Sequence, residues 1–397
     1  MSFDLKSMRD PDNYGVAQRG RAVPFGLHLQ AQEIDSLRGI AAFLVFIFHA
    51  ERVIGKNTEQ LSGVFGYLQA FVVTGATGVT LFFILSGFLL SMPFFKNPNP
   101  DRVLFYKKRF IRIIPIYWLI VTVACVATGL IFNDPLKAIK SYLFLFEGRD
   151  MFPFSIPWWT LRTEIQFYLL LPLLMPLIHY RRGRWILISM IPLYILSMLF
   201  VFYMPNDGNW KLYSQIYAIF LQSVIRHAPV FIMGIIMSWV YLKYGQAIKE
   251  YLSSSNIFKN GLSDVIVICA FFLLSLVLRK VSLLGGTLVA EFNWPQRYIY
   301  ESVPWCVIFM GVLLLPLRMK LALSNRFFAQ FGKISYPFYF VHLPVLFYVS
   351  DNYSFRKKGW SLETMEIVAL CFILAYIISY IINKFIETPL LRYKNNL

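Results

Sequence analysis

The sequence has 397 residues, of which 57% are hydrophobic, 18% aromatic and only 15% charged. This composition excludes a soluble globular protein and predicts a polytopic membrane protein. The net charge of +17 does not indicate a nucleic-acid partner, because the lysines and arginines lie in short loops between apolar segments, where they set membrane topology. The four cysteines also lie in apolar runs, so we expect neither a disulfide framework nor a bound metal.

Apolar runs of about twenty residues are long enough to cross the roughly 30 Å hydrocarbon layer of a bilayer. The sequence contains ten such runs, which predicts an all-α fold with ten transmembrane helices. The predicted spans are 36–54, 72–92, 113–132, 160–179, 185–204, 215–242, 262–278, 299–317, 333–350 and 365–386.

The orientation follows from the distribution of lysine and arginine. With the N-terminus inside, the cytoplasmic segments carry more of these residues than the external ones, and an even number of spans returns the C-terminus to the cytoplasm. The first residues contain no apolar core followed by a cleavage site, so we expect no removable signal peptide. We predict cytoplasmic tails over 1–33 and 393–397 and a membrane domain over 34–392.

The first and fourth spans carry ionisable side chains, which are costly in hydrocarbon and therefore mark functional sites. Arg38 lies near the inner end of the first span, and His49, eleven residues later, lies ~16 Å further out. Glu164 lies in the outer half of the fourth span, which runs in the opposite direction. Since a carboxylate can orient an imidazole and stabilise its protonated form, we predict that His49 and Glu164 meet as an acid/base pair.

The third span opens with the densest basic cluster, YKKRFIRIIP, on the predicted cytoplasmic side. Arg109 and Arg112 are three residues apart and share one face of a helix. Together with Lys108 they form a candidate site for a polyanion such as the phosphates of a nucleotide-like cofactor.

Candidate substrate contacts lie near the acid/base pair. Trp158 and Trp159 border Glu164 and can form a platform that stacks on a sugar. His342 lies in the middle of a predicted span between two prolines. We expect it either to hydrogen-bond the backbone carbonyls that the prolines leave without a partner or to take part in chemistry on the acceptor side. Tyr339, three residues earlier, is predicted as a further substrate contact. Arg226 and His227 interrupt the sixth predicted span without a motif partner, and no role is assigned to them.

Several of these motifs, in this order, resemble those of the acyltransferase-3 family of integral membrane acyltransferases, and the match runs from about residue 33 to 392. The first motif has arginine, ten residues and then histidine. The fourth has Thr160 where many members have serine, a conservative departure. The matching segments are LRGIAAFLVFIFHA (37–50), LFFILSGFLL (81–90), KKRFIRIIPIYW (107–118), PWWTLRTEIQFYLLLP (157–172), ISYPFYFVHLP (334–344) and ETPLLR (387–392).

The resemblance implies an O-acyltransferase of the bacterial inner membrane. Its donor would be acyl-CoA, usually acetyl-CoA, and its acceptor a hydroxyl of a surface or exported carbohydrate such as lipopolysaccharide O-antigen. The resemblance further implies that His49 is the catalytic histidine, Arg38 its partner and Glu164 the fourth-span acid, and that Arg109 and Arg112 hold the donor phosphates. The acceptor's identity and the oligomeric state stay open.

Other interpretations of the same residues also stay open. His49 either deprotonates the acceptor hydroxyl directly or is itself transiently acylated. Glu164 can instead neutralise Arg162, the paired arginines can be topology anchors, and Ser86 with Gly87 is typical of close helix packing. A proton-coupled transporter, or one that moves acyl groups or glycans, would use the same intramembrane histidine, arginine and glutamate.

Overall fold

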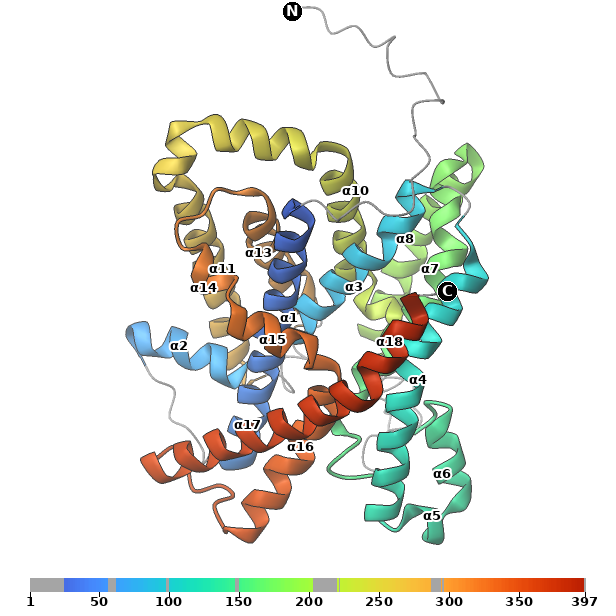
Figure 1. The fold of residues 1–397 in the computed structure, drawn as a ribbon, viewed down its shortest axis with the longest axis vertical. Helices are drawn as coiled ribbons and strands as arrows, with labels where there is room; N and C mark the ends of the chain where they lie inside the picture. The colour runs from blue at the N-terminus through green and yellow to red at the C-terminus, as the bar shows by residue number, and fades with distance from the viewer. Residues whose placement is uncertain are drawn as a thin grey trace, which may run out of the picture.

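The computed structural model describes residues 25–55, 62–97, 100–146, 150–202, 220, 222–286, 294 and 296–395. Over these residues the chain is helical, with short turns and no strand (Figure 1). The helices in order are α1 (Phe25–Ile54), α2 (Gly63–Val73), α3 (Thr77–Lys96), α4 (Arg102–Ala127), α5 (Leu130–Asn133), α6 (Pro135–Tyr142), η2 (Ile156–Trp158), α7 (Trp159–Leu174), η3 (Met175–His179), α8 (Arg181–Phe202), α10 (Val224–Ser254), η4 (Phe258–Leu262), α11 (Ser263–Leu283), α13 (Arg297–Leu314), α14 (Lys320–Leu323), α15 (Arg326–Lys333), α16 (Ser335–Asn352), α17 (Leu362–Ile382), η5 (Asn383–Glu387) and α18 (Thr388–Asn395).

Among the described residues, seven helices are long and apolar enough to cross a membrane, which makes the chain a multi-pass membrane protein. They are Thr77–Lys96, Arg102–Ala127, Ile156–His179, Val224–Ser254, Phe258–Leu283, Arg297–Leu314 and Leu362–Tyr393. The prediction of an all-α membrane fold is therefore confirmed, whereas ten spans and the orientation of the termini stay predictions. Parts of two predicted spans, residues 203–204 and 215–219 with 221, lie outside the described residues.

Two predicted boundaries were wrong. The run 72–92 contains a break, because α2 ends at Val73 and a turn precedes the start of α3 at Thr77. The third span was expected to open near residue 113, but α4 begins at Arg102, where the Asp101 side chain accepts a hydrogen bond from the Leu104 amide at 2.9 Å. Arg109 and Arg112 therefore lie two to three turns inside α4.

Large apolar side chains remain exposed on the outer helices. On α17, for example, Ile373, Ile377 and Ile381 are about half exposed and follow one another at a spacing of four residues. A soluble protein rarely leaves such a stripe in water, but a bilayer covers it. This face of α17 is therefore suited to contact lipid.

Helix α1 runs through the middle of the bundle, in contact with α3, α15 and α16 (Figure 1). Glycines permit its closest approaches. A Cβ on Gly332, in α15, would overlap the carbonyl oxygen of Asp35, and one on Gly78, in α3, would overlap that of Ala41. This packing brings Arg38 and His49, on α1, next to side chains of α16.

Helix α3 crosses α10 where Gly87 and Gly234 face each other. A Cβ on Gly87 would overlap the Phe231 carbonyl oxygen, and one on Gly234 would overlap that of Ile84. Both overlaps involve backbone atoms, which cannot rotate away. The close packing predicted for Gly87 is confirmed, and it brings Ser86 and Phe83 of α3 to the centre of the bundle.

We predict that Gly87→Ala lowers the free energy of unfolding by about 1–3 kcal/mol, because the new methyl group forces α3 away from α10. Gly245→Ala, on α10, is the control, since its Cβ would meet only side-chain atoms, of Tyr241 at 3.3 Å and of Leu314 at 3.7 Å. Thermal unfolding of the two purified variants in detergent measures the difference. Equal midpoints for Gly87→Ala and the wild type would show that the crossing is loose.

Candidate active site

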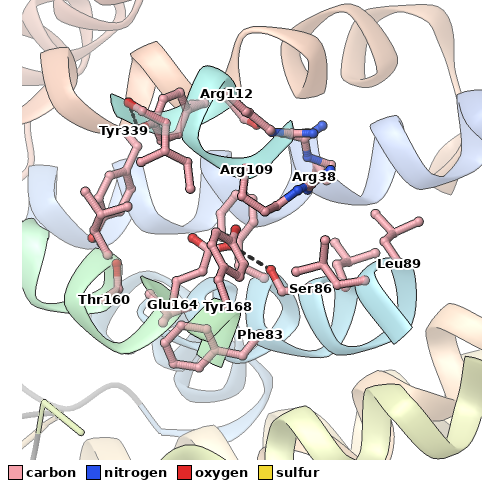
Figure 2. Close-up of a pocket in the computed structure, with 18 residues that line it drawn as sticks. Arg38, Phe83, Ser86, Leu89, Arg109, Arg112, Thr160, Glu164, Tyr168 and Tyr339 are labelled. Atoms are coloured by element: carbon pink, nitrogen blue, oxygen red, sulfur yellow. Dashed lines mark hydrogen bonds between the residues drawn. The ribbon is translucent and has the colours of Figure 1, made fainter. Parts of the chain in front are cut away.

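Two cavities lie next to each other in the centre of the bundle. The first, called here the arginine cavity, has a volume of about 330 Å³ and is lined by residues of α1, α3, α4, α7 and α16. Figure 2 shows its three arginines on one side and Thr160 with Tyr339 at the other. Its polar lining consists of Arg38, Ser86, Arg109, Arg112, Thr160, Glu164, Tyr168, Ser335, Tyr336 and Tyr339.

The arginines of this cavity come from two helices. Arg38 donates a hydrogen bond to the Ser335 hydroxyl at 3.2 Å and lies 3.6 Å from an Asp35 carboxylate oxygen. Arg109 and Arg112 are three residues apart on α4, and the buried Nε of Arg109 has no hydrogen-bond partner among the described residues. The predicted pair of arginines therefore does face a cavity, and Arg38 joins it.

Glu164 is the acid of the arginine cavity. Its carboxylate accepts a hydrogen bond from the Ser86 hydroxyl at 2.7 Å and another from the Tyr168 hydroxyl (Figure 2). It does not neutralise Arg162, whose guanidinium donates to the carbonyls of Phe144 and Phe146 and to the Gln222 side chain. Ser86 was expected only to permit close helix packing, but its hydroxyl also donates a hydrogen bond to Glu164.

The second cavity, called here the histidine cavity, has a volume of about 420 Å³. It lies between α1, α3, the start of α7, α10, α13 and α16, and apolar and aromatic side chains form much of its wall. Its polar and aromatic lining includes Phe48, His49, Arg52, Trp159, Thr160, Gln222, Arg226, Arg297, Tyr298, Tyr339 and Phe347. Its size falls within the range of small-molecule sites.

The partner of His49 is His342. The Nδ1 atom of His49 lies 2.9 Å from Nε2 of His342, and Nδ1 of His342 lies 2.9 Å from the Phe338 carbonyl oxygen. The expected contact between His49 and Glu164 is therefore corrected, because Glu164 is held in the neighbouring cavity by Ser86 and Tyr168. Of the two predicted alternatives for His342, the contact with a backbone carbonyl is observed, and a role in chemistry on the acceptor side stays a prediction.

This chain of hydrogen bonds defines the tautomers of the two rings when both are neutral. A carbonyl oxygen can only accept, so Nδ1 of His342 carries the proton and Nε2 presents a lone pair. That lone pair accepts the Nδ1 proton of His49. The Nε2 atom of His49 is then the free base, on a half-buried ring that lines the histidine cavity.

The two cavities meet at Val79, Thr160 and Tyr339, which line both. The hydroxyls of Thr160 and Tyr339 are hydrogen-bonded to each other at 2.5 Å, and the Tyr339 hydroxyl also donates to the Pro157 carbonyl. Tyr339 was predicted as a substrate contact, and the structure places it at this junction. A group passing between the cavities would have to pass these hydroxyls.

The two tryptophans and the lysine that were predicted as substrate or cofactor contacts lie in different surroundings. Trp158 is fully buried among Tyr117, Phe146 and Phe340 and lines neither cavity, which corrects its expected role in sugar stacking. The turn η2 directs it into the core, whereas Trp159 lines the histidine cavity. Lys108 is half-buried on α4 and does not line the arginine cavity.

A buried polar cluster on α13 was missed from the sequence. Arg297 forms a fully buried ion pair with Glu301 at 2.8 Å, and the Thr80 hydroxyl donates to the same carboxylate at 2.8 Å. Arg297 also donates to the Tyr298 hydroxyl at 2.9 Å. The spacing of four residues between Arg297 and Glu301 was the available signal.

Comparisons with known proteins identify the family of this chain. A sequence model of the acyltransferase domain matches residues 32–384, so the chain belongs to this acyltransferase family. The O-acetyltransferase OatA of Staphylococcus aureus is 24% identical over 390 residues, covering 90% of this chain and 56% of OatA. The peptidoglycan O-acetyltransferase OatA of Listeria monocytogenes is 22% identical over 393 residues, covering 90% of this chain and 55% of that protein. The chain thus spans about half the length of these relatives, and no solved structure matches.

We predict that Glu301→Gln lowers the free energy of unfolding by about 3–5 kcal/mol, because it leaves the buried Arg297 guanidinium without its countercharge. The matched control is Asp351→Asn, which breaks the exposed pair with Arg356 and should change stability by less than about 1 kcal/mol. Thermal unfolding in detergent measures the stability of both variants. If the two variants unfold at the same temperature, the α13 ion pair has no structural role.

Proposed function

We propose that this protein is a membrane O-acyltransferase that moves an acetyl group from acetyl-CoA to a hydroxyl of a cell-envelope carbohydrate. The observation that carries the proposal is the pair of adjoining cavities: both are lined by three arginines, and the second is also lined by a histidine whose Nε2 has a free lone pair. Such an arrangement suits two substrates that enter separately and react at a shared junction. The names of the two relatives support the acetyl group and the carbohydrate acceptor.

The arginine cavity suits the donor. Arg38, Arg109 and Arg112 line the cavity with one carboxylate, Glu164, and the Asp35 carboxylate lies 3.6 Å from Arg38 outside the lining. The positive charges outnumber these carboxylates, so the lining favours a polyanion such as the phosphates of coenzyme A. Glu164, held by Ser86 and Tyr168, limits the repulsion between the guanidinium groups. We place this cavity on the cytoplasmic side, with ten spans and both termini in the cytoplasm, and we place the protein in the bacterial inner membrane.

The histidine cavity suits the acceptor. His49 takes the proton of the acceptor hydroxyl on Nε2, the hydroxyl oxygen attacks the thioester carbonyl, and the bond from carbon to sulfur breaks. An ester forms, and the thiolate of coenzyme A leaves and takes up the proton that His49 removed from the hydroxyl, which restores the free base. His342 keeps His49 in the reactive tautomer, and the hydroxyls of Thr160 and Tyr339 lie at the junction where charge develops on the carbonyl oxygen.

We predict that His49→Ala lowers kcat/KM for acetyl transfer at least ~100-fold, because the general base is lost. His342→Ala should cause a smaller loss, and His342→Gln should retain more activity, since the amide oxygen can still accept the His49 Nδ1 proton. His179→Ala is the control, because His179 lies in η3 against the Phe94 carbonyl and lines neither cavity.

The measurement is ester formation by purified protein, followed by mass spectrometry together with release of free thiol. Wild-type rates in His49→Ala would refute its catalytic role. Movement of acetyl-CoA or glycan across vesicles without loss of thioester would favour the transporter instead.

We predict that Arg109→Gln and Arg112→Gln each raise the KM for acetyl-CoA about 10-fold with a smaller change in kcat, because each removes one charge-assisted contact to phosphate. The rise in KM with added salt should also become shallower in both variants. Lys107→Gln, an exposed position on the same helix, is the control and should keep the wild-type KM. An unchanged KM in both arginine variants would make them topology anchors.

A further inference from the structure

The two cavities follow one another along the same helices. Next to and within α3, Ala76 lines the histidine cavity, Val79 lines both cavities and Ser86 lines the arginine cavity. On α16, Tyr336 lines the arginine cavity and Leu343 lines the histidine cavity. The cavities are therefore arranged end to end, and a donor whose phosphates bind at the arginines approaches the histidine through the junction between them.

The junction consists of one apolar side chain and two hydroxyls. Among the described residues, those that line both cavities are Val79, Thr160 and Tyr339. The hydroxyls of Thr160 and Tyr339 are hydrogen-bonded to each other at 2.5 Å and form the polar part of the junction. Val79 has no donor or acceptor in its side chain and forms the apolar part. A thioester has the same two parts, a carbonyl oxygen that accepts hydrogen bonds and an acyl chain that does not.

Val79 is held in place and cannot easily make room for a larger group. A Cβ on Gly75 would lie 2.2 Å from the Leu44 carbonyl oxygen, and one on Gly78 would lie 2.3 Å from that of Ala41, so the backbone just before Val79 is packed tightly on α1. A valine in a helix also has one strongly preferred χ1 rotamer. Its side chain is 8% exposed. It therefore forms a wall of fixed size.

The wall next to Val79 is filled as well. Phe83, one turn further along α3, lines the arginine cavity and is 2% exposed. Its ring stacks on Phe231 with 4.7 Å between the ring centroids and lies 5.1 Å from the His227 ring. These contacts fix the orientation of Phe83. An acyl chain that turned back from the junction along α3 would meet this ring.

We propose that Val79 sets the length of the acyl group that the protein accepts. The inference rests on the proposed function for the identity of the donor as an acyl-CoA. When the thioester carbonyl lies at the hydroxyls of Thr160 and Tyr339, the acyl chain contacts the Val79 side chain. A longer chain has to displace Val79 or withdraw the carbonyl from the hydroxyls. The donors that fit are thus the shortest acyl thioesters, and acetyl fits best.

The test compares acetyl-, propionyl- and butyryl-CoA, which differ by one methylene each. Dissociation constants for the purified full chain in detergent are measured by titration calorimetry without an acceptor. Ester formation on soluble peptidoglycan fragments is measured separately by mass spectrometry. We expect the wild type to bind propionyl-CoA about tenfold more weakly than acetyl-CoA, and butyryl-CoA more weakly still, because an extra methylene that does not fit is rejected by about this factor.

Variants make the test specific to the junction. Val79→Ala removes two methyl groups and should bring the affinity for propionyl-CoA to within about threefold of that for acetyl-CoA. Val79→Ile adds a methylene and should weaken the binding of acetyl-CoA itself. Val121→Ala is the matched control, because Val121 is fully buried on α4 and lines neither cavity.

Free coenzyme A has no acyl chain and should bind equally to the wild type and to all three variants. This measurement separates a change at the junction from damage to the arginine cavity. If Val79→Ala fails to fold, the wild-type series and Val79→Ile still test the inference.

A wild-type affinity that does not fall with acyl length would overturn the inference, as would a Val79→Ala variant that keeps the wild-type preference for acetyl-CoA. A preference that is lost equally in Val121→Ala would also overturn it. A preference that depends on Val79, without ester on any fragment, would support the inference and count against the proposed function. Ester formation at equal rates from all three donors would support the transferase and overturn the inference.

Discussion

The hydrogen bond between His49 and His342 joins α1 to α16 at the centre of the bundle, and the proposed chemistry depends on it. The Phe338 carbonyl orients His342, and His342 in turn orients His49, so the reactive nitrogen is defined by the backbone of a packed helix. A histidine on a single helix could adopt either tautomer. Here His49 has a hydrogen bond to the backbone of Val45 on its own helix as well as the contact with His342. The second contact depends on the position of α1 against α16, which glycine contacts with α3 and α15 help to set.

The same packing separates the ionisable groups into two sets. Glu164 belongs with the three arginines on one side of Thr160 and Tyr339, and the paired histidines lie on the other. Had Glu164 paired with His49, the arginine cavity would lose its only lining carboxylate among the described residues. In the proposed function each cavity has its own task, with binding of the donor phosphates in one and proton transfer in the other.

The sequence was sufficient to predict the class of fold and several of the ionisable residues that line the cavities. Long apolar runs define helices, and ionisable residues inside them are too costly to be incidental, which is why Arg38, His49, Glu164 and the arginines of α4 were found. It was harder to predict which of these side chains contact each other. Depth along a helix can be read from residue number, but rotation about the helix axis and the partner helix cannot.

His49 and Glu164 consequently share an expected depth without sharing a cavity, and Trp158 and Trp159, adjacent in sequence, point to the core and to a cavity respectively. The Arg297–Glu301 pair was missed because the predicted span began at residue 299, beyond the arginine. Such side-chain directions depend on tertiary packing, which hydropathy does not encode.

In the proposed mechanism, donor and acceptor enter different cavities and meet between them. Its most direct test uses sealed vesicles containing the purified protein, with the carbohydrate acceptor trapped inside and acetyl-CoA, which does not cross lipid, added only outside. We expect acetyl ester on the trapped acceptor, with an equal amount of free thiol released outside. Ester that forms only when donor and acceptor share one compartment would contradict it.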